Sequence, residues 1–167
     1  IELMSFVKDL ELDYDLYIGA SVQEEVGLRG ARTMSYKINP DLAVAIDISP
    51  AKDIPAPSKV GDLGLGTYIR HKDAYTIYPK AVTQYLEELF TKNKIKWQNY
   101  ISAGGTNAGI IHTNREGITT IPLGFVARNL HTGSTVFDKG DYKETLKAAK
   151  AIVKSLNTKE IERIIGK

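Results

Sequence analysis

Short apolar segments that alternate with helical patterns constrain the fold more than any other feature of this chain. Residues 42–48 (LAVAIDI) form a continuous apolar run, too short for a helix and typical of a strand buried on both faces. Residues 119–126 form another predicted strand, and helices are expected at 79–93 and 141–156. Alternating strands and helices imply right-handed crossovers. The sequence therefore predicts a three-layer α/β/α sandwich with a largely parallel sheet.

The other expected elements complete a single domain over residues 1–167. Further strands are expected at residues 14–22, 67–70 and 95–102, a long proline- and glycine-rich loop at 49–66, and further helices at 1–10, 26–38, 107–115 and 158–165. The first helical pattern begins without a preceding N-cap residue, so we expect a chain cut inside or just before a helix.

Composition excludes several classes of protein. Lys and Arg number 22 and Asp and Glu 20, so the net charge of +2 gives no reason to expect a nucleic acid or an anionic membrane as partner. The chain has no cysteine, which excludes disulfides, thiolate metal sites and a cysteine nucleophile. No apolar run is long enough to span a bilayer and no signal peptide is visible, so a cytoplasmic location is expected.

Acidic and histidine residues follow the predicted strands. Glu24 and Glu25 come directly after residues 14–22, Asp47 lies in the apolar run 42–48, and His131 follows the strand at 119–126. The carboxyl ends of parallel strands meet at one edge of a sheet, so these side chains predict a hydrolytic metal site. One glutamate would bind metal and its neighbour would act as general base toward water.

Each of these residues also has a structural interpretation. An exposed Glu24–Glu25 pair at a helix start is favoured by the helix dipole alone. Asp47 could be a structural aspartate satisfied by backbone donors, and a lone His131 is more often structural than a ligand. His71 is expected to be solvated and His112 to pack or cap a helix.

Two further segments are candidates for substrate binding. The turn at residues 104–109 (GGTNAG) lacks the lysine of a phosphate-binding loop, but Gly105 would allow close approach of a ligand to backbone amides at a helix start. Arg70 ends a short strand, where a guanidinium could pair with a substrate carboxylate. The structural alternatives are a simple tight turn and an exposed arginine. There is no Gly-x-Ser-x-Gly elbow and no His-Glu-x-x-His helix.

In order and spacing, four segments resemble the tetrahedral, di-metal aminopeptidases of the glutamyl aminopeptidase-like group. These segments are QEEVGLRGA (23–31), VAIDISPAKD (44–53), GGTNAG (104–109) and VARNLHT (126–132). The resemblance implies that Glu24 is the general base and that Glu25, Asp47 and His131 bind two zinc or cobalt ions. It also implies a peptide substrate and a homo-oligomer, the twelve-subunit tetrahedral shell of this family. Arg70 and its segment resemble the branch that prefers acidic N-terminal residues.

The chain departs from the family pattern in two ways. The family has a histidine ligand and a bridging aspartate upstream of the glutamate pair, and a β-rich inserted domain, none of which has a counterpart in this sequence. We therefore expect an incomplete site that is inactive by itself. The family usually has aspartate where Asn107 stands, which predicts an altered hydrogen bond rather than lost metal. The alternatives are a metal-dependent deacylase or carboxypeptidase on the same scaffold, and a non-catalytic subunit or interaction module.

Overall fold

Two pairs of parallel strands form the centre of the fold. A computed structural model describes residues 1–56 and 60–167. The strands are β1 (Leu42–Pro50), β2 (Thr67–Lys72), β3 (Trp97–Ile101), β4 (Thr119–Arg128) and β5 (Val136–Phe137). The helices are α1 (Glu2–Val7), α2 (Arg29–Ile38), α3 (Lys80–Lys92), α4 (Asn107–His112), α5 (Lys139–Ser155) and α6 (Thr158–Ile165). β1 pairs with β4 and β2 pairs with β3, both in parallel, while the short β5 is antiparallel to β4.

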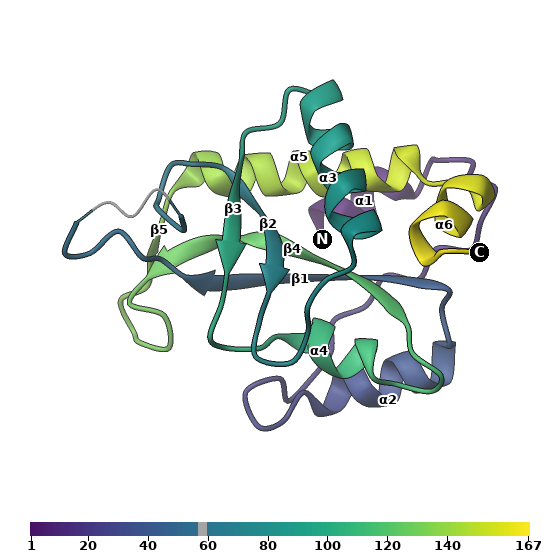
Figure 1. Ribbon diagram of the computed structural model, residues 1–167, viewed down its shortest axis with the longest axis horizontal. Coiled ribbons are helices and arrows are strands. Elements are labelled where there is room, and N and C mark those ends of the chain that lie inside the picture. Colours follow the sequence, from purple (N-terminus) through teal and green to yellow (C-terminus); the bar gives the residue numbers. More distant parts are fainter. Residues whose placement is uncertain (57–59) are drawn as a thin grey trace.

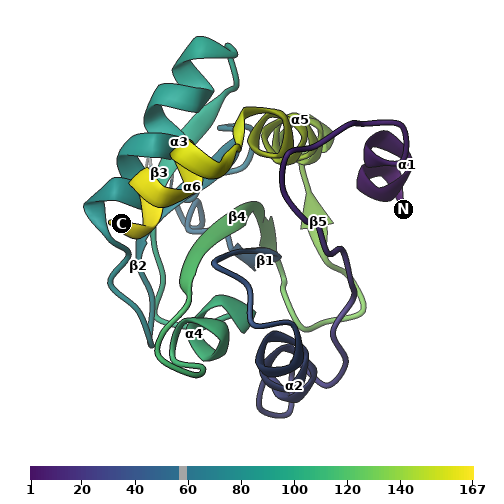
Figure 2. The ribbon, with the colours of Figure 1, turned by 90° about the vertical axis from the view of Figure 1, so that its right-hand side faces the viewer.

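Helices cover the strands from two sides (Figures 1 and 2). α2 and α4 lie on one side, where Ala31, Ala45 and Ile111 belong to a common buried cluster. α3, α5 and α6 lie on the other side and share a larger core with β2 and β4, in which Leu86 and Ile121 are fully buried. The three-layer arrangement and the mainly parallel pairing confirm the predicted fold class.

Side-chain caps fix where several helices begin. Asp138 accepts hydrogen bonds from the backbone N–H groups of Gly140 and Asp141 at the start of α5, and Asn157 accepts from Glu160 at the start of α6. Thr106 caps α4 by accepting from the N–H of Ala108. Each cap satisfies a backbone donor that has no partner within the helix. The first turn of each helix is thereby fixed by local sequence.

The structure corrects some of the expected elements. Residues 14–22 run as irregular chain rather than as a strand, because no neighbouring strand pairs with their backbone among the described residues. α1 ends at Val7, and α4 ends at His112 rather than near residue 115. The two-residue β5 was not expected. The predicted loop at 49–66 includes residues 57–59, which lie outside the described residues.

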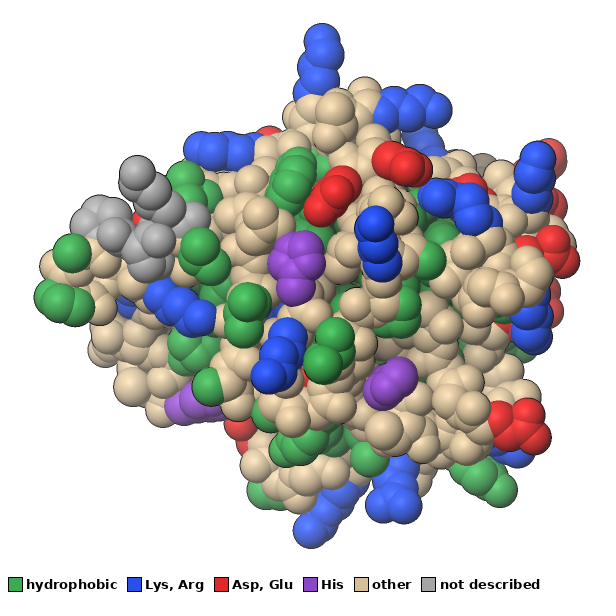
Figure 3. All heavy atoms as spheres, in the orientation of Figure 1, with side chains coloured by type: hydrophobic (Ala, Val, Ile, Leu, Met, Phe, Trp, Pro, Cys, Tyr) green, Lys and Arg blue, Asp and Glu red, His purple; other side chains and the backbone are tan. Residues whose placement is uncertain are grey.

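The surface is mixed in character. Basic and acidic side chains are interspersed with hydrophobic ones over the face shown in Figure 3. Among the described helices, none combines the length and apolar character needed to cross a bilayer.

Candidate active site

A tight turn before α2 positions the glutamate pair. The N–H groups of Gly27 and Leu28 both donate to the carbonyl of Glu24, and Gly30 N donates to the carbonyl of Val22 at 2.9 Å. A Cβ at Gly30 would lie 2.4 Å from the backbone nitrogen of Val22, so only glycine fits there. The turn leaves Glu24 half-buried and Glu25 exposed immediately before the helix.

The close pairing of β1 with β4 positions Asp47. Asp47 is opposite Gly124 in the parallel register, and a Cβ at Gly124 would lie 1.7 Å from the Asp47 carbonyl oxygen. The hydroxyl of the buried Tyr68 donates to the same carbonyl at 3.1 Å. The N–H of Ile48 donates to the Asp47 carboxylate at 2.7 Å, which leaves the other carboxylate oxygen available. Asp47 is thus held by its backbone with its side chain half-buried.

His131 lies in the loop between β4 and β5 and reaches Glu25. Its Nδ1 is 3.2 Å from Oε1 of Glu25, and both side chains are mainly exposed. His131 has a φ of 62°, and Gln23, beside the glutamate pair, has a φ of 58°. Left-handed backbone at residues other than glycine is uncommon and is concentrated at functional sites. The two loops that bring the imidazole and the carboxylate together both contain such positions.

The carboxylates of the site interact electrostatically. Partial burial raises the pKa of Glu24, and the nearby charges of Asp47 and Glu25 raise it further, against the opposing effect of His131. Burial also raises the pKa of Asp47, while the Ile48 N–H and the Arg70 guanidinium oppose that shift. Three segments of the chain therefore contribute to one electrostatic cluster, which comprises Glu24, Glu25, Asp47 and His131.

The donor set of this cluster fits part of a metal centre. Imidazole and carboxylate are suitable ligands for zinc and cobalt, and close carboxylates with raised pKa values are the groups that a cation would stabilise. In residues 1–56 and 60–167, however, no three histidine, cysteine or acidic side chains converge tightly enough to enclose one ion. Glu25 and His131, whose side chains approach to 3.2 Å, could supply two ligands to one ion.

A large groove opens beside these carboxylates. Its volume is about 1100 Å³, and it runs along the edge of β1 that has no strand partner among the described strands. Glu24, Glu25 and Asp47 line it, together with Ser21 and Asn107. The acidic groups are therefore accessible from a space large enough for several residues of an extended polypeptide.

The glycine-rich turn lies beside this groove. The Nδ2 of Asn107 donates to the hydroxyl of Ser21 at 3.0 Å, and its buried Oδ1 has no protein partner. Gly105 packs beneath the ring of Tyr75, where a Cβ would lie 2.1 Å from a ring carbon. Close packing of an aromatic ring thus accounts for glycine at position 105. The side-chain amide of Asn107 donates to Ser21, which an ionised aspartate at this position could not do.

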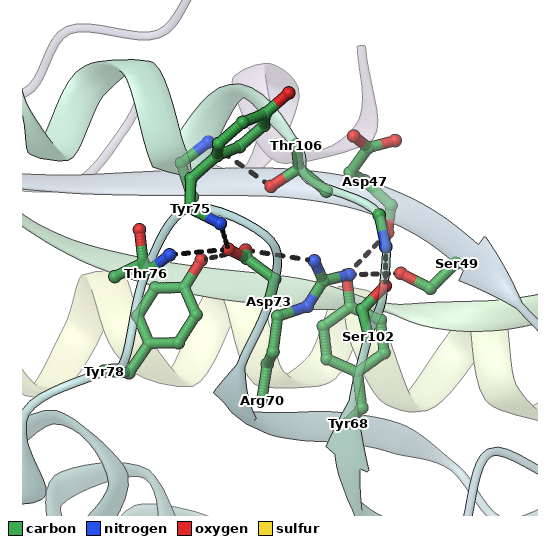
Figure 4. Close-up of polar contacts among 12 residues, drawn as sticks. Asp47, Ser49, Tyr68, Arg70, Asp73, Tyr75, Thr76, Tyr78, Ser102 and Thr106 are labelled. Atoms are coloured by element: carbon green, nitrogen blue, oxygen red, sulfur yellow. Dashed lines mark hydrogen bonds and ion pairs between the residues drawn. The ribbon is translucent and has the colours of Figure 1, made fainter.

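Arg70 does not lie at an open rim, and the sequence-based expectation of an exposed position was wrong. Its side chain is 1% exposed, and its Nη1 lies 3.3 Å from Oδ2 of Asp73, which is also buried. The guanidinium also donates to Ser49 and stands over the ring of Tyr68 (Figure 4). In the same view the Asp47 carboxylate points away from the guanidinium. The hydrophobic pattern that placed Arg70 on a strand was informative, but it could not reveal an acidic partner on the following turn.

A further ion pair was missed by sequence reasoning. Arg128 donates from Nε to Oδ1 of Asp53 at 3.0 Å and from Nη2 to Oδ2 at 2.8 Å. Asp53 ends the segment 44–53 and Arg128 lies in the segment 126–132, but 75 positions separate the two residues. A local signal could not show that they pair.

Comparisons with known proteins agree on one family. The family model described as M42 glutamyl aminopeptidase matches residues 1–148. The glutamyl aminopeptidase of Lactococcus lactis subsp. cremoris is 40% identical over 164 residues, which are 98% of this chain and 46% of that protein. The lysyl aminopeptidase of Pyrococcus furiosus is 38% identical over 149 residues, which are 87% of this chain and 42% of that protein.

Solved structures give the same result. An aminopeptidase from the archaeon Desulfurococcus kamchatkensis superposes with a TM-score of 0.89 at 33% identity, covering 97% of this chain and 47% of that one. The TET1 peptidase of Pyrococcus horikoshii, which can assemble into a tetrahedron or a large octahedral shell, has a TM-score of 0.71 at 30% identity and covers 81% and 40%. The chain thus spans about half the length of the relatives it matches.

Proposed function

We propose that this chain, which belongs to the M42 glutamyl aminopeptidase family, supplies part of the active site of a metal-dependent enzyme that removes N-terminal residues from peptides. The observation that carries this proposal is the meeting of Glu25 and His131 at 3.2 Å, in electrostatic contact with Glu24 and Asp47. The four residues come from three separate segments, and the groove beside them has room for a peptide.

Three of these residues have the chemistry of ligands. Zinc or cobalt ions held by Glu25, Asp47 and His131 would polarise the scissile carbonyl and acidify a water molecule. Zinc in proteins usually has four ligands, so these three residues are too few to hold two ions. We therefore infer that the complete site includes ligands that this chain does not contain, and that the chain alone binds metal weakly.

Glu24 is suited to move the proton. Its raised pKa brings the carboxylate closer to the working range of a general base. In the proposed reaction Glu24 accepts a proton from water as the oxygen forms a bond to the peptide carbonyl carbon. The same proton then passes to the departing amine as the C–N bond breaks. Because Glu24 is more buried than Glu25, it is the better candidate for this role.

Substrate preference and assembly are finer parts of the proposal. The two relatives above are named for glutamyl and lysyl residues at similar identity, so family membership does not determine the preferred side chain. We propose a preference for acidic N-terminal residues, with Arg70 as the selectivity residue. This role requires that a substrate carboxylate reach the Arg70 guanidinium, which in this structure faces Ser49 and Asp73. A homo-oligomer is proposed from the assembly of the TET1 peptidase.

Two substitutions test the assignment in an enzyme with the complete ligand set. Glu24→Gln is expected to abolish turnover of an aminoacyl anilide and to keep the metal content, because the residue acts on water. His131→Ala is expected to lower the metal content, because the imidazole is a ligand. Metal loss from Glu24→Gln with full metal in His131→Ala would reverse the roles of these two residues.

A further inference from the structure

The segments that carry Asp47 and His131 are joined by one charged pair, Asp53 with Arg128. Asp53 follows β1, the strand of Asp47, and Arg128 is the last residue of β4, immediately before the loop of His131. We propose that Asp53 and Arg128 are positioning residues that hold the His131 loop in place for metal binding. This inference rests on the proposed function of His131 as a ligand.

The geometry of the pair is that of a strong interaction. Two parallel hydrogen bonds of 3.0 and 2.8 Å join the guanidinium to both carboxylate oxygens of Asp53. The Asp53 side chain is only 7% exposed, and it also accepts from the N–H of Leu63 at 3.2 Å. The bidentate arrangement fixes orientation as well as distance, and it shields the Asp53 carboxylate although the Arg128 side chain is 40% exposed.

The loop that Arg128 carries is closed by its own hydrogen bonds. The hydroxyls of Thr132 and Thr135 both donate to the carbonyl of Asn129, at 2.8 and 3.1 Å. Ser134 N donates to the hydroxyl of Thr132 at 3.1 Å. Hydrogen bonds among their own residues therefore close residues 129–135 into a loop.

This loop must be attached to the rest of the protein if the His131 side chain is to keep its orientation. Its base is a two-residue antiparallel pairing of β4 with β5, in which Arg128 lies opposite Val136. Both β5 residues are partly exposed, and the Phe137 ring packs against that of Phe125 with ring centroids 5.3 Å apart. On the β1 side, Ala51 N donates to the carbonyl of Ala127 at 2.8 Å, which places Asp53 within reach of Arg128. The charged pair thus adds a side-chain attachment between the base of the loop and the segment after β1.

Two variants and a matched control test the proposal. Asp53→Asn removes the negative charge with little change of side-chain shape. Arg128→Lys keeps the positive charge but loses the bidentate hydrogen-bond geometry. Glu160→Gln is the control, because Glu160 forms a similar multidentate pair with Arg163 on α6, away from the His131 loop. Zinc affinity is measured by competition with a chromophoric chelator, and amide hydrogen exchange of residues 129–135 is measured in the zinc-free chain.

The expected result is a selective one. Asp53→Asn and Arg128→Lys each weaken zinc binding about tenfold, as loss of groups that orient a ligand typically does. They also speed exchange of the loop amides, whereas Glu160→Gln does not. Unchanged exchange in residues 129–135 overturns the proposal, whether or not zinc binding is measurable. If zinc affinity falls in neither Asp53→Asn nor His131→Ala, the ligand role of His131 fails instead.

Discussion

The buried Arg70–Asp73 pair makes a strong prediction about stability. In Arg70→Met the aspartate stays in the interior and loses its only cationic partner among the described residues. Breaking a buried pair by removing one partner costs about 3–5 kcal/mol. Asp73 keeps donors from the N–H groups of Tyr75 and Thr76 and from the hydroxyl of Tyr78, so we expect the lower end, about 3 kcal/mol.

Urea unfolding and thermal melting measure this loss. For a chain of this size, about 3 kcal/mol corresponds to a fall in Tm of about 6–12 °C. Arg163→Met is the matched control, because its pairs with Glu88 and Glu160 are more exposed and should contribute less than about 1 kcal/mol. The double variant Arg70→Met with Asp73→Asn should recover part of the loss, since the uncompensated charge is gone.

A loss below about 1 kcal/mol in Arg70→Met would refute this reasoning. It would mean that the guanidinium is not needed to hold Asp73 in the interior. The proposed selectivity role of Arg70 is tested separately. Glutamyl, aspartyl, leucyl and lysyl substrates are compared before and after Arg70→Ala in variants that are still folded. An unchanged ranking would remove Arg70 as the selectivity residue.

Three further outcomes are expected. Gly124→Ala should destabilise the chain by about 1–3 kcal/mol in urea, because its Cβ would collide with the Asp47 carbonyl, whereas Gly133→Ala should be nearly neutral because nothing lies within 4 Å of a Cβ there. Arg128 lowers the pKa of Asp53, so the pair stabilises the folded state above the pKa of the unfolded aspartate. The difference in unfolding free energy between Asp53→Asn and the unaltered chain should therefore vanish as pH falls through the folded pKa of Asp53. A difference that persists in acid would contradict this linkage. The chain alone should not hydrolyse aminoacyl anilides with added zinc or cobalt, and robust turnover would show that no further ligands are needed.

Sequence patterns predicted the position of several elements. The run 42–48 became β1, and the helix expected at 158–165 has those bounds in the structure. The expectation that both faces of this strand are buried was wrong, because Val44 and Ile46 are exposed. The segment 14–22 has the composition of a strand, but a strand also requires a neighbour with which to pair, and none of the described strands pairs with it. Periodicity reports which face of a segment is apolar and says nothing about the partner of its backbone.

The candidate site shows the same difference between what local sequence reveals and what long-range contacts determine. The glutamate pair and His131 could be named because acidic and imidazole groups after apolar strands suggest metal chemistry. That Glu25 and His131 meet could not be read from local pattern, since 106 positions separate them. The burial of Arg70 depends on Asp73, Ser49 and two tyrosine rings that come from three strands and a turn. Long-range contacts of this kind determine whether a charged side chain is buried in an ion pair or is available to bind substrate.

The most direct test of the central claim uses the three histidines of the chain. Zinc is titrated into the chain with ¹⁵N-labelled imidazole rings, and the ring nitrogens are followed by NMR. We predict that zinc shifts the ring signals of His131 and leaves those of His71 and His112 in place, and that Glu25→Gln weakens the effect. Equal shifts at His71 or His112, or an unmoved His131, would contradict the assignment of His131 and Glu25 to a metal centre.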